Sequence, residues 1–381
     1  MSRQIIGLSE LEAREPRWLW RGHLLREAVN LFVGKRGLGK TVLAAWVAAQ
    51  ATLGATEWGG RPLRVFVDTR EDDPRVDYRP RIEAAGGEMS LIETRRLGTA
   101  PWTFPHDLDR LGEYLRARRD QGRPIDLCLF DSLGAFVPRL TQPEQAAQAL
   151  EGLTLLALEF ECAFLFVHHF LKTMGRTIDS AIGGAGAVQR IARTIHLFGE
   201  QPRNPLQLLV RRARGQPLSD EVDGARILAC TKLNVAARPA SLRFTLEVVS
   251  LPAVEQVPVL RLDGESAYND LAVFEQACQP PVVDATSELE AACEWAVAYL
   301  LDSPLAYARP TQRLLADGKH AGFSQRTLER ARTKIGLLRI PPAKLCEHLG
   351  QLACAQLDEE ERAAWWVALP DFIPPPEQWQ V

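Results

Sequence analysis

The chain has 381 residues and a formal net charge of −3, and 46% of its residues are hydrophobic against 24% charged. This length allows two or more domains. The share of hydrophobic residues excludes a disordered chain, and the net charge argues against a protein that coats nucleic acid over its whole surface. No apolar run approaches the roughly 18 residues of a membrane span, and no apolar signal-peptide region follows the first residues, so we expect neither a membrane nor a secreted protein. The seven cysteines include no C-x-x-C pair, so we expect reduced thiols, no zinc and a cytoplasmic protein.

After a polar lead-in over residues 1–28, strand-like apolar runs alternate with helical patterns up to about residue 250. The strand-like runs are Val29–Val33, Leu63–Val67, Leu127–Phe130, Ala163–Val167, Ile195–Phe198, Leu206–Val210, Ile227–Thr231 and Leu242–Val249. The helical patterns are 41–52, 107–119, 143–160 and 185–193. This alternation predicts a doubly wound, mainly parallel α/β sheet over 29–250. The last three runs have no helices between them and predict an antiparallel extension of that sheet.

The chain changes character after residue 250. The Pro-rich, aperiodic stretch 251–284 is typical of a linker. Three short helical patterns follow, at 287–301, 310–316 and 325–335, and we expect Ser324 to be the N-cap and Gly336 the C-cap of the third. They predict a small helix-turn-helix or winged-helix domain over 285–340, with a plain helical bundle as the alternative. The tail 341–381 has no assignment.

The small C-terminal domain is locally basic. Between Arg309 and Arg339 there are eight Lys or Arg residues and two acids, a local balance of +6. Such a balance suits the phosphate backbone of DNA, although a solvated basic face is the alternative. On the third helix Arg326, Arg330 and Lys334 are spaced four residues apart and share one face, so they are the candidate DNA contacts there.

A glycine-rich loop of the form G-x-x-x-x-G-K-T runs from Gly34 to Thr41, between a strand-like and a helix-like segment. Its glycines let successive N–H groups point at phosphate oxygens, and the following helix adds the positive end of its dipole. Lys40 is expected to reach the β- and γ-phosphates of ATP, and the Thr41 hydroxyl to hold Mg²⁺. The expected nucleotide contacts are Gly34, Lys35, Arg36, Gly37, Leu38, Gly39, Lys40, Thr41 and Val42. A surface glycine turn is the alternative, which the strand and helix on either side disfavour.

Carboxylates follow two further strands. Asp131 ends the run Leu127–Phe130 and is expected to hold Mg²⁺ through water, with a helix N-cap as the alternative. No acid follows Asp131, so the base that activates the attacking water must come from elsewhere. We prefer Glu71, at the end of the neighbouring strand, over the rival acids Asp68 and Asp72; a solvated turn is the alternative.

Two histidines, His168 and His169, follow the strand-like run Ala163–Val167. A polar side chain at this strand end can sense whether a γ-phosphate is present, and we expect His168 to do so, with a structural role as the alternative. A metal pair is disfavoured because no spaced cysteine or carboxylate completes a site.

Together these elements resemble the RecA-like P-loop NTPase superfamily, and within it the RepA-like hexameric replicative helicases and AAA-type ATPases of plasmids and phages, over residues 14–250. The resemblance is carried by Pro16-Arg17-Trp18-Leu19, Arg64 to Pro74, Asp131-Ser132-Leu133, His168 to Lys172, Ile182 to Arg193 and Thr231-Lys232-Leu233-Asn234. It implies Glu71 as the catalytic base, and Arg193 and Lys232 as residues that act on the nucleotide of a neighbouring subunit. Ordinary surface cations are the alternative for these two.

The resemblance implies an ATP-hydrolysing DNA helicase that forms a homo-oligomeric, hexameric ring around single-stranded DNA in replication of a plasmid, phage or mobile element. Loops carrying Arg139, Lys172 and Arg176 would face that DNA. The family pattern is altered at 183–186, where a phosphate or DNA contact is weakened, and an Arg-rich stretch at 203–215 is a further source of a finger or DNA contact. A nucleotide-gated DNA-binding regulator or loader with a slow ATPase is the alternative; a metabolite kinase is weak, because no acceptor lid is recognisable.

Overall fold

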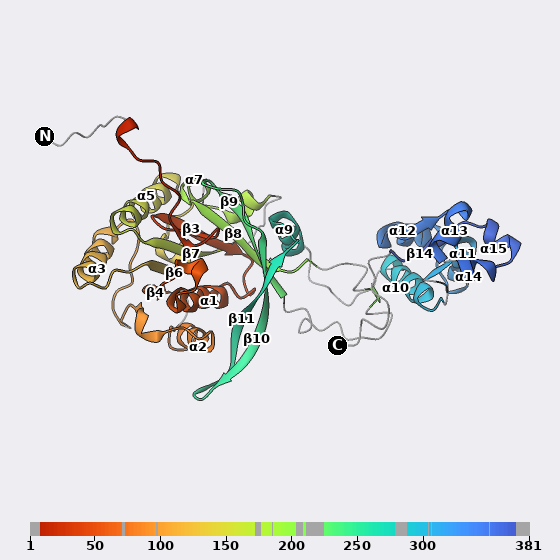
Figure 1. Ribbon diagram of the computed structural model, residues 1–381, viewed down its shortest axis with the longest axis horizontal. Coiled ribbons are helices and arrows are strands. Elements are labelled where there is room, and N and C mark those ends of the chain that lie inside the picture. Colours follow the sequence, from red (N-terminus) through yellow and green to blue (C-terminus); the bar gives the residue numbers. More distant parts are fainter. Residues whose placement is uncertain are drawn as a thin grey trace. The chain divides into compact units, whose positions relative to one another are not determined.

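The computed structural model describes residues 8–70, 73–96, 98–171, 177–184, 186–202, 209–210, 225–278, 288–303, 305, 307–349 and 351–370. The chain divides into two compact units (Figure 1). The first comprises residues 1–202 and 224–279, and the second comprises residues 203–223 and 280–381. Within the described ranges, no helix combines the length and apolar character needed to cross a membrane.

The first unit is built on a nine-stranded sheet with the order β11-β10-β9-β8-β3-β7-β6-β4-β5. The parallel strands are β8 (Thr194–Glu200), β3 (Ala28–Gly34), β7 (Ala163–His169), β6 (Leu127–Asp131), β4 (Val65–Thr69) and β5 (Ile92–Thr94). The antiparallel strands are β9 (Ala225–Leu233), β10 (Ser241–Leu251) and β11 (Val254–Ser266). This is the mainly parallel α/β sheet with an antiparallel extension that the sequence predicts, and it is consistent with a RecA-like P-loop domain.

Helices cover both faces of this sheet, because successive side chains of each buried strand point to opposite sides. One face packs against α1 (Lys40–Leu53) and α2 (Tyr78–Ala84). The opposite face packs against α3 (Leu108–Asp120), α4 (Leu133–Phe136), α5 (Pro143–Phe160), α6 (Ile178–Ile182), α7 (Ala187–Ile191) and α9 (Asp270–Cys278). Along β6, Leu127 and Leu129 belong to the α1 side and Cys128 and Phe130 to the other.

The lead-in folds onto the first unit. Its strands β1 (Trp18–Trp20) and β2 (Leu24–Leu25) pair antiparallel, and the Trp20 ring stacks on Trp58. The buried Asn30 on β3 accepts a 2.9 Å hydrogen bond from the Leu25 N–H. The short 3₁₀ helices are η1 (Leu8–Glu10), η2 (Thr56–Trp58) and η3 (Met89–Leu91).

The structure differs from the expected linker at 251–284. Residues 254–266 form β11, which makes a long hairpin with β10, and residues 270–278 form α9 (Figure 1). Pro258 is tolerated because β11 is the outermost strand, so its missing N–H leaves the pairing with β10 intact. The expected strand Leu206–Val210 is also wrong where it is described, since residues 209 and 210 are helical.

The second unit has three layers. Helices α10 (Glu288–Leu301), α11 (Thr311–His320) and α12 (Gln325–Ile335) form the first layer. An antiparallel sheet follows, in the order β12 (Ala308–Pro310), β14 (Trp366–Ala368) and β13 (Leu338–Ile340). On β14, Val367 packs toward the first layer and Trp366 toward the third. The third layer holds η4 (Pro342–Lys344), α13 (Leu345–Leu349), α14 (Gln351–Ala355) and α15 (Glu359–Ala363).

The expected caps of α12 are confirmed. The Ser324 hydroxyl accepts a 3.1 Å hydrogen bond from the Thr327 N–H at the start of the helix. Gly336 has φ 73° at the end, a left-handed conformation that a glycine adopts without strain.

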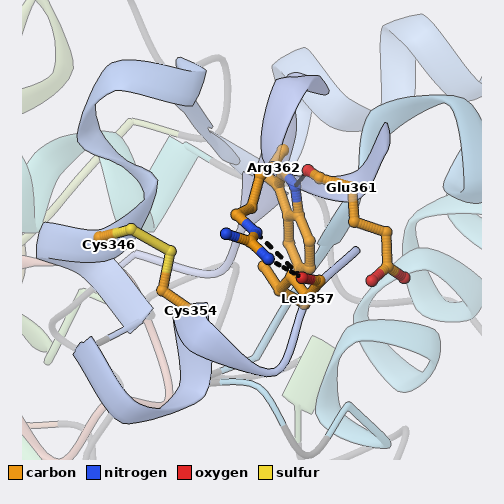
Figure 2. The surroundings of a disulfide bond; sticks show 6 residues. Cys346, Cys354, Leu357, Glu361 and Arg362 are labelled. Carbon is orange, nitrogen blue, oxygen red and sulfur yellow. Dashed lines mark hydrogen bonds between the residues drawn. A yellow bond between two sulfur atoms is a disulfide. The ribbon is translucent and has the colours of Figure 1, made fainter. Parts of the chain in front are cut away.

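A disulfide joins Cys346 on α13 to Cys354 on α14, with Cα atoms 5.2 Å apart (Figure 2). The expectation of reduced thiols is therefore wrong for this pair; their separation of eight residues matches no short motif, and only the packing of two helices brings them together. Beside the disulfide, the Arg362 guanidinium donates hydrogen bonds of 2.9 and 2.7 Å to the Leu357 carbonyl oxygen (Figure 2). The tail as far as residue 370 is thus a folded part of the second unit.

Candidate nucleotide-binding site

The glycine-rich loop follows β3, and α1 begins at Lys40 directly after it. Gly37 and Gly39 have φ values of 81° and 88°, which favour glycine. Gly34 is constrained by space instead: a Cβ there would lie 2.2 Å from the carbonyl oxygen of Phe198 on β8. The motif therefore has the strand, loop and helix that a phosphate site at a helix N-terminus requires.

Lys40 is buried at the base of this loop, with 3% of its surface exposed. Its ammonium donates a 2.7 Å hydrogen bond to the Lys35 carbonyl oxygen, so the side chain folds back against the loop. The charge is thereby placed among the backbone groups expected to surround the phosphates.

Asp131 lies at the end of β6 and is 1% exposed. Its side chain follows the alternation of β6 toward α1, where the Thr41 hydroxyl donates a 2.8 Å hydrogen bond to Asp131 Oδ2. The alternative role as a helix N-cap is not observed, since Ser132 occupies the N-cap position of α4. A hydroxyl and a carboxylate side by side are oxygen ligands of the kind that Mg²⁺ prefers, so Thr41 and Asp131 fit the expected metal.

The structure describes only the two end residues, Arg70 and Asp73, of the acidic segment that follows β4. The Arg70 N–H donates a 3.0 Å hydrogen bond to the Asp131 carbonyl oxygen, whereas Glu71 and Asp72 lie outside the described residues. Asp68 is 2% exposed. Phe66, two positions earlier on β4, packs on the sheet face opposite α1, and side chains two positions apart on a strand share a face. An Arg95 ion pair of 3.0 Å holds Asp68, and burial raises the pKa of its carboxyl. Asp68 is therefore directed away from Asp131.

His168 ends the buried part of β7 beside Val33 of β3, and its Nε2 lies 2.7 Å from the Ile182 carbonyl oxygen at the end of α6. Burial lowers the pKa of His168 to about 4, so the ring is neutral at physiological pH. Because a carbonyl only accepts, Nε2 carries the single ring proton. Among the described residues, no group of three or more His, Cys, Asp or Glu side chains could hold a metal, so His168 and His169 complete no such site.

Arg193 and Lys232 lie at the other edge of the sheet. Arg193 directly precedes β8, is exposed, and donates its N–H to the Val29 carbonyl oxygen at 2.9 Å near the start of β3. Lys232 of β9 pairs with Ile195, and its ammonium donates hydrogen bonds to the carbonyl oxygens of Gln189 and Arg190 at the end of α7. Burial, and then the charge of Arg193, lower the pKa of Lys232. The structure thus brings Arg193 and Lys232 together, away from Lys40 of the same chain.

The candidate DNA contacts of the first unit are described only in part. Arg139 is exposed, and its guanidinium lies 3.4 Å from Gln145 Oε1. Lys172 and Arg176 lie outside the described residues, as does Ala185 and most of the Arg-rich stretch 203–215.

The candidate DNA contacts of the second unit lie on α12. Arg326 and Arg330 are exposed there. The third candidate, Lys334, forms an ion pair within the unit: its ammonium lies 3.8 Å from a Glu290 carboxylate oxygen of α10.

Two residues at the site are not predicted by the sequence. Tyr78, the first residue of α2, donates its hydroxyl to Asp131 Oδ2 at 2.9 Å. Arg226 of β9 donates through Nε to the carbonyl oxygen of Leu38 in the glycine-rich loop at 3.3 Å. Neither stands in a motif; only the packing of α2 and the pairing of β9 with β8 bring them to the site.

Residues 2–175 match the family model of the AAA domain. This stretch contains the glycine-rich loop, Thr41, Asp131 and His168, which are the residues whose geometry is described above. No curated protein matches the sequence. The matched stretch, residues 2–175, is similar to the AAA-type ATPase domains of the P-loop NTPases, and the geometry of its site agrees with that similarity.

Proposed function

We propose that the chain is an ATP-hydrolysing RecA-like motor that acts on DNA as a ring of identical subunits, that is, a RepA-like DNA helicase. The observation that carries this proposal is the division of the charged residues between two edges of one parallel sheet. Lys40 and Asp131 lie at the carboxyl edge, whereas Arg193 and Lys232 lie at the amino edge. A single copy therefore holds two halves of a site that only two copies complete.

At the carboxyl edge, Lys40 and the loop N–H groups would bind the phosphates of ATP, and Thr41 and Asp131 would hold magnesium. When bound, the magnesium ion neutralises charge on the β- and γ-phosphate oxygens. Glu71 is the proposed base. It would take a proton from a water whose oxygen bonds to the γ-phosphorus while the bond to the bridging oxygen breaks, releasing ADP and phosphate.

At the amino edge, Arg193 is too far from its own loop to touch the γ-phosphate. Its N–H is bound to Val29, and β3 runs from there to Gly34 over five residues, about 16 Å at the usual rise of a strand. A head-to-tail contact between copies would place Arg193 and Lys232 against a neighbour's loop, and such contacts form a ring when the rotation from copy to copy closes. An arginine supplied in this way is worth roughly 10³-fold or more in rate.

His168 is the proposed link between nucleotide and DNA. The neutral ring has one proton, which is shared with the Ile182 carbonyl oxygen. If the Nε2–H donated its hydrogen bond to a γ-phosphate oxygen instead, the Ile182 carbonyl oxygen would lose this partner. The end of α6 would then no longer be held by His168. Ile182 precedes Gly183 and Gly184, whose positive φ values of 71° and 84° allow the chain to change direction. In this proposal the loop that carries Lys172 and Arg176 responds to the nucleotide.

The second unit supports a further role in DNA binding. Its elements follow in the order α10, β12, α11, α12 and β13, then η4 and the helices α13, α14 and α15, and finally β14. Apart from the helices inserted between β13 and β14, this order resembles that of a winged helix, in which α12 would be the recognition helix. Arg326 and Arg330 are exposed on α12. This arrangement favours the second candidate function, a nucleotide-gated DNA-binding regulator, in which the second unit recognises a duplex and ATP turnover is slow.

Mixing two inactive variants tests the shared site. Lys40→Ala and Arg193→Ala proteins are each expected to be inactive, but a 1:1 mixture contains interfaces that pair an intact loop with an intact arginine. Randomly mixed rings have such interfaces in about a quarter of positions, so about a quarter of the wild-type ATPase rate should return.

The matched control mixes Lys40→Ala with Glu71→Gln. In this proposal Lys40 and Glu71 act on the same half of the site, so no interface is repaired and no activity should return. Mixed oligomers verified by mass that stay inactive in the first experiment would contradict a site shared between subunits.

Glu71→Gln alone separates the two candidate functions. For a motor, the variant loses both ATP turnover and strand separation of a forked DNA. For a regulator, the variant keeps sequence-selective duplex binding, measured by fluorescence anisotropy, at the wild-type affinity.

A further inference from the structure

We propose that Tyr78 is a positioning residue, which holds Asp131 in the orientation that magnesium binding needs. The inference rests on the proposed ATPase function and names a residue that no motif of the chain includes. Tyr78 opens α2, is 2% exposed, and donates its hydroxyl to Asp131 Oδ2 at 2.9 Å.

The same carboxylate oxygen accepts a second hydrogen bond, from the Thr41 hydroxyl at 2.8 Å. A threonine hydroxyl has one proton and two lone pairs. Because the Thr41 proton is given to Asp131, its lone pairs are directed elsewhere and are available to a metal ion. The Thr41 hydroxyl keeps this orientation only while Asp131 Oδ2 stays in position. Two hydrogen bonds to that oxygen, from Thr41 and Tyr78, oppose rotation of the carboxylate.

Tyr78 also ties α2 to the end of β6. Arg70, directly after β4, donates its N–H to the Asp131 carbonyl oxygen at 3.0 Å. Tyr78 binds the side chain of that same aspartate from the start of the next helix. Arg70 directly after β4 and Tyr78 at the start of α2 therefore both contact Asp131. A displacement of α2 would consequently displace the Asp131 side chain.

A second tyrosine of the same unit provides the comparison for a merely structural role. The Tyr114 hydroxyl on α3 donates to Glu93 Oε2 at 3.1 Å, on the sheet face opposite α1. Tyr78→Phe and Tyr114→Phe therefore remove the same atom and the same kind of bond. Only the first bond reaches a proposed magnesium ligand.

The test measures how much Mg²⁺ strengthens the binding of a fluorescent ADP analogue, mant-ADP. The dissociation constant is measured with Mg²⁺ and with EDTA for the wild type and both variants. Loss of a partner that orients a metal ligand typically weakens metal binding 10- to 100-fold. We expect Tyr78→Phe to reduce the gain from Mg²⁺ about tenfold, with unchanged affinity in EDTA, and Tyr114→Phe to keep the wild-type gain.

A Tyr78→Phe protein with the wild-type gain from Mg²⁺ overturns the inference and leaves the proposed function standing. A wild-type protein that binds no mant-ADP overturns both. The affinity for mant-ADP in EDTA covers a general loss of packing. A positioning role leaves this affinity at the wild-type value in Tyr78→Phe, whereas a loss of affinity that is equal with Mg²⁺ and with EDTA contradicts the positioning role.

Discussion

The α-carbon of Gly34 faces the backbone of Phe198 so closely that a Cβ would lie 2.2 Å from the Phe198 carbonyl oxygen. Gly34 ends β3 and opens the phosphate-binding loop, and Phe198 lies on the neighbouring strand β8. Close approach of two backbones, not a turn, therefore requires glycine here. The relationship fixes the height at which the loop leaves the sheet.

Gly34→Ala is expected to destabilise the first unit by about 3 kcal/mol, because a backbone atom has to move to admit the methyl group. Gly37→Ala is the matched control within the same loop. Its φ of 81° is strained for alanine, but no heavy atom of the described residues, apart from its own chain neighbours, lies within 4 Å of the new Cβ, so the cost should be about 1 kcal/mol. Urea unfolding without nucleotide measures both, and equal costs would contradict the close approach.

Asp131→Asn is expected to abolish the Mg²⁺ dependence of nucleotide binding while the fold is kept. The amide oxygen can still accept from Thr41 and Tyr78, but the negative charge that attracts the cation is lost. ATP turnover should fall by about 100-fold or more, as when an electrostatic group is removed from a phosphoryl-transfer site. Isothermal titration with ADP, with and without Mg²⁺, checks the first effect. An undiminished response to Mg²⁺ would exclude Asp131 as a ligand.

His168 makes stability depend on pH. Burial lowers its pKa to about 4, whereas a histidine of an unfolded chain titrates near 6.5. Between these values the unfolded chain binds a proton that the folded chain does not, so the unfolding free energy is highest above pH 6.5 and falls toward pH 4. The slope is about 1.4 kcal/mol per pH unit for one such group.

His168→Gln keeps an N–H donor for Ile182 and removes the titration, so it should flatten the fall in stability between pH 6.5 and 4. The pKa of the buried His23 is lowered to about 4 in the same way, so part of the fall remains. Melting temperatures across this pH range provide the measurement. A variant whose profile runs parallel to that of the wild type would show that His168 is not the titrating group.

Arg326→Ala/Arg330→Ala is expected to weaken binding of duplex DNA and to make it less sensitive to salt. If each arginine contacts one phosphate, the slope of log affinity against log salt should fall by roughly two. Arg116→Ala on α3 of the first unit is a control with an exposed arginine outside the proposed interface. Anisotropy titrations over a range of salt concentrations measure the slope, and an unchanged slope would remove α12 from the DNA contact.

The sequence predicts the phosphate-binding part of the fold because the evidence there is local. The strand before Gly34, the glycines and the helix from Lys40 are adjacent in the chain, so one short window contains the whole device. Asp131 is also predictable, since a single acid ends a buried strand. By contrast, β11 resembles a linker because Pro252 lies just before it and Pro258 interrupts its pattern, and its edge position explains why Pro258 is accepted.

The contacts that the sequence does not reveal are those made between distant segments. The hydroxyl of Tyr78 reaches Asp131 across 53 residues, and Arg226 reaches Leu38 across 188. The disulfide of Cys346 and Cys354 depends on how α13 and α14 pack. The spacing of residues along the chain does not predict any of these contacts, because the packing and register of the helices and strands determine which residues come into contact.

The most direct test of the central claim is phosphate release by purified Lys40→Ala protein beside the wild type, at saturating Mg·ATP and with single-stranded DNA. The wild type is expected to release phosphate and to be stimulated by DNA, whereas Lys40→Ala is expected to be at least about 100-fold slower at an unchanged melting temperature. Equal rates for the two proteins, or a wild type that releases no phosphate, would contradict the claim that the loop around Lys40 binds and hydrolyses ATP.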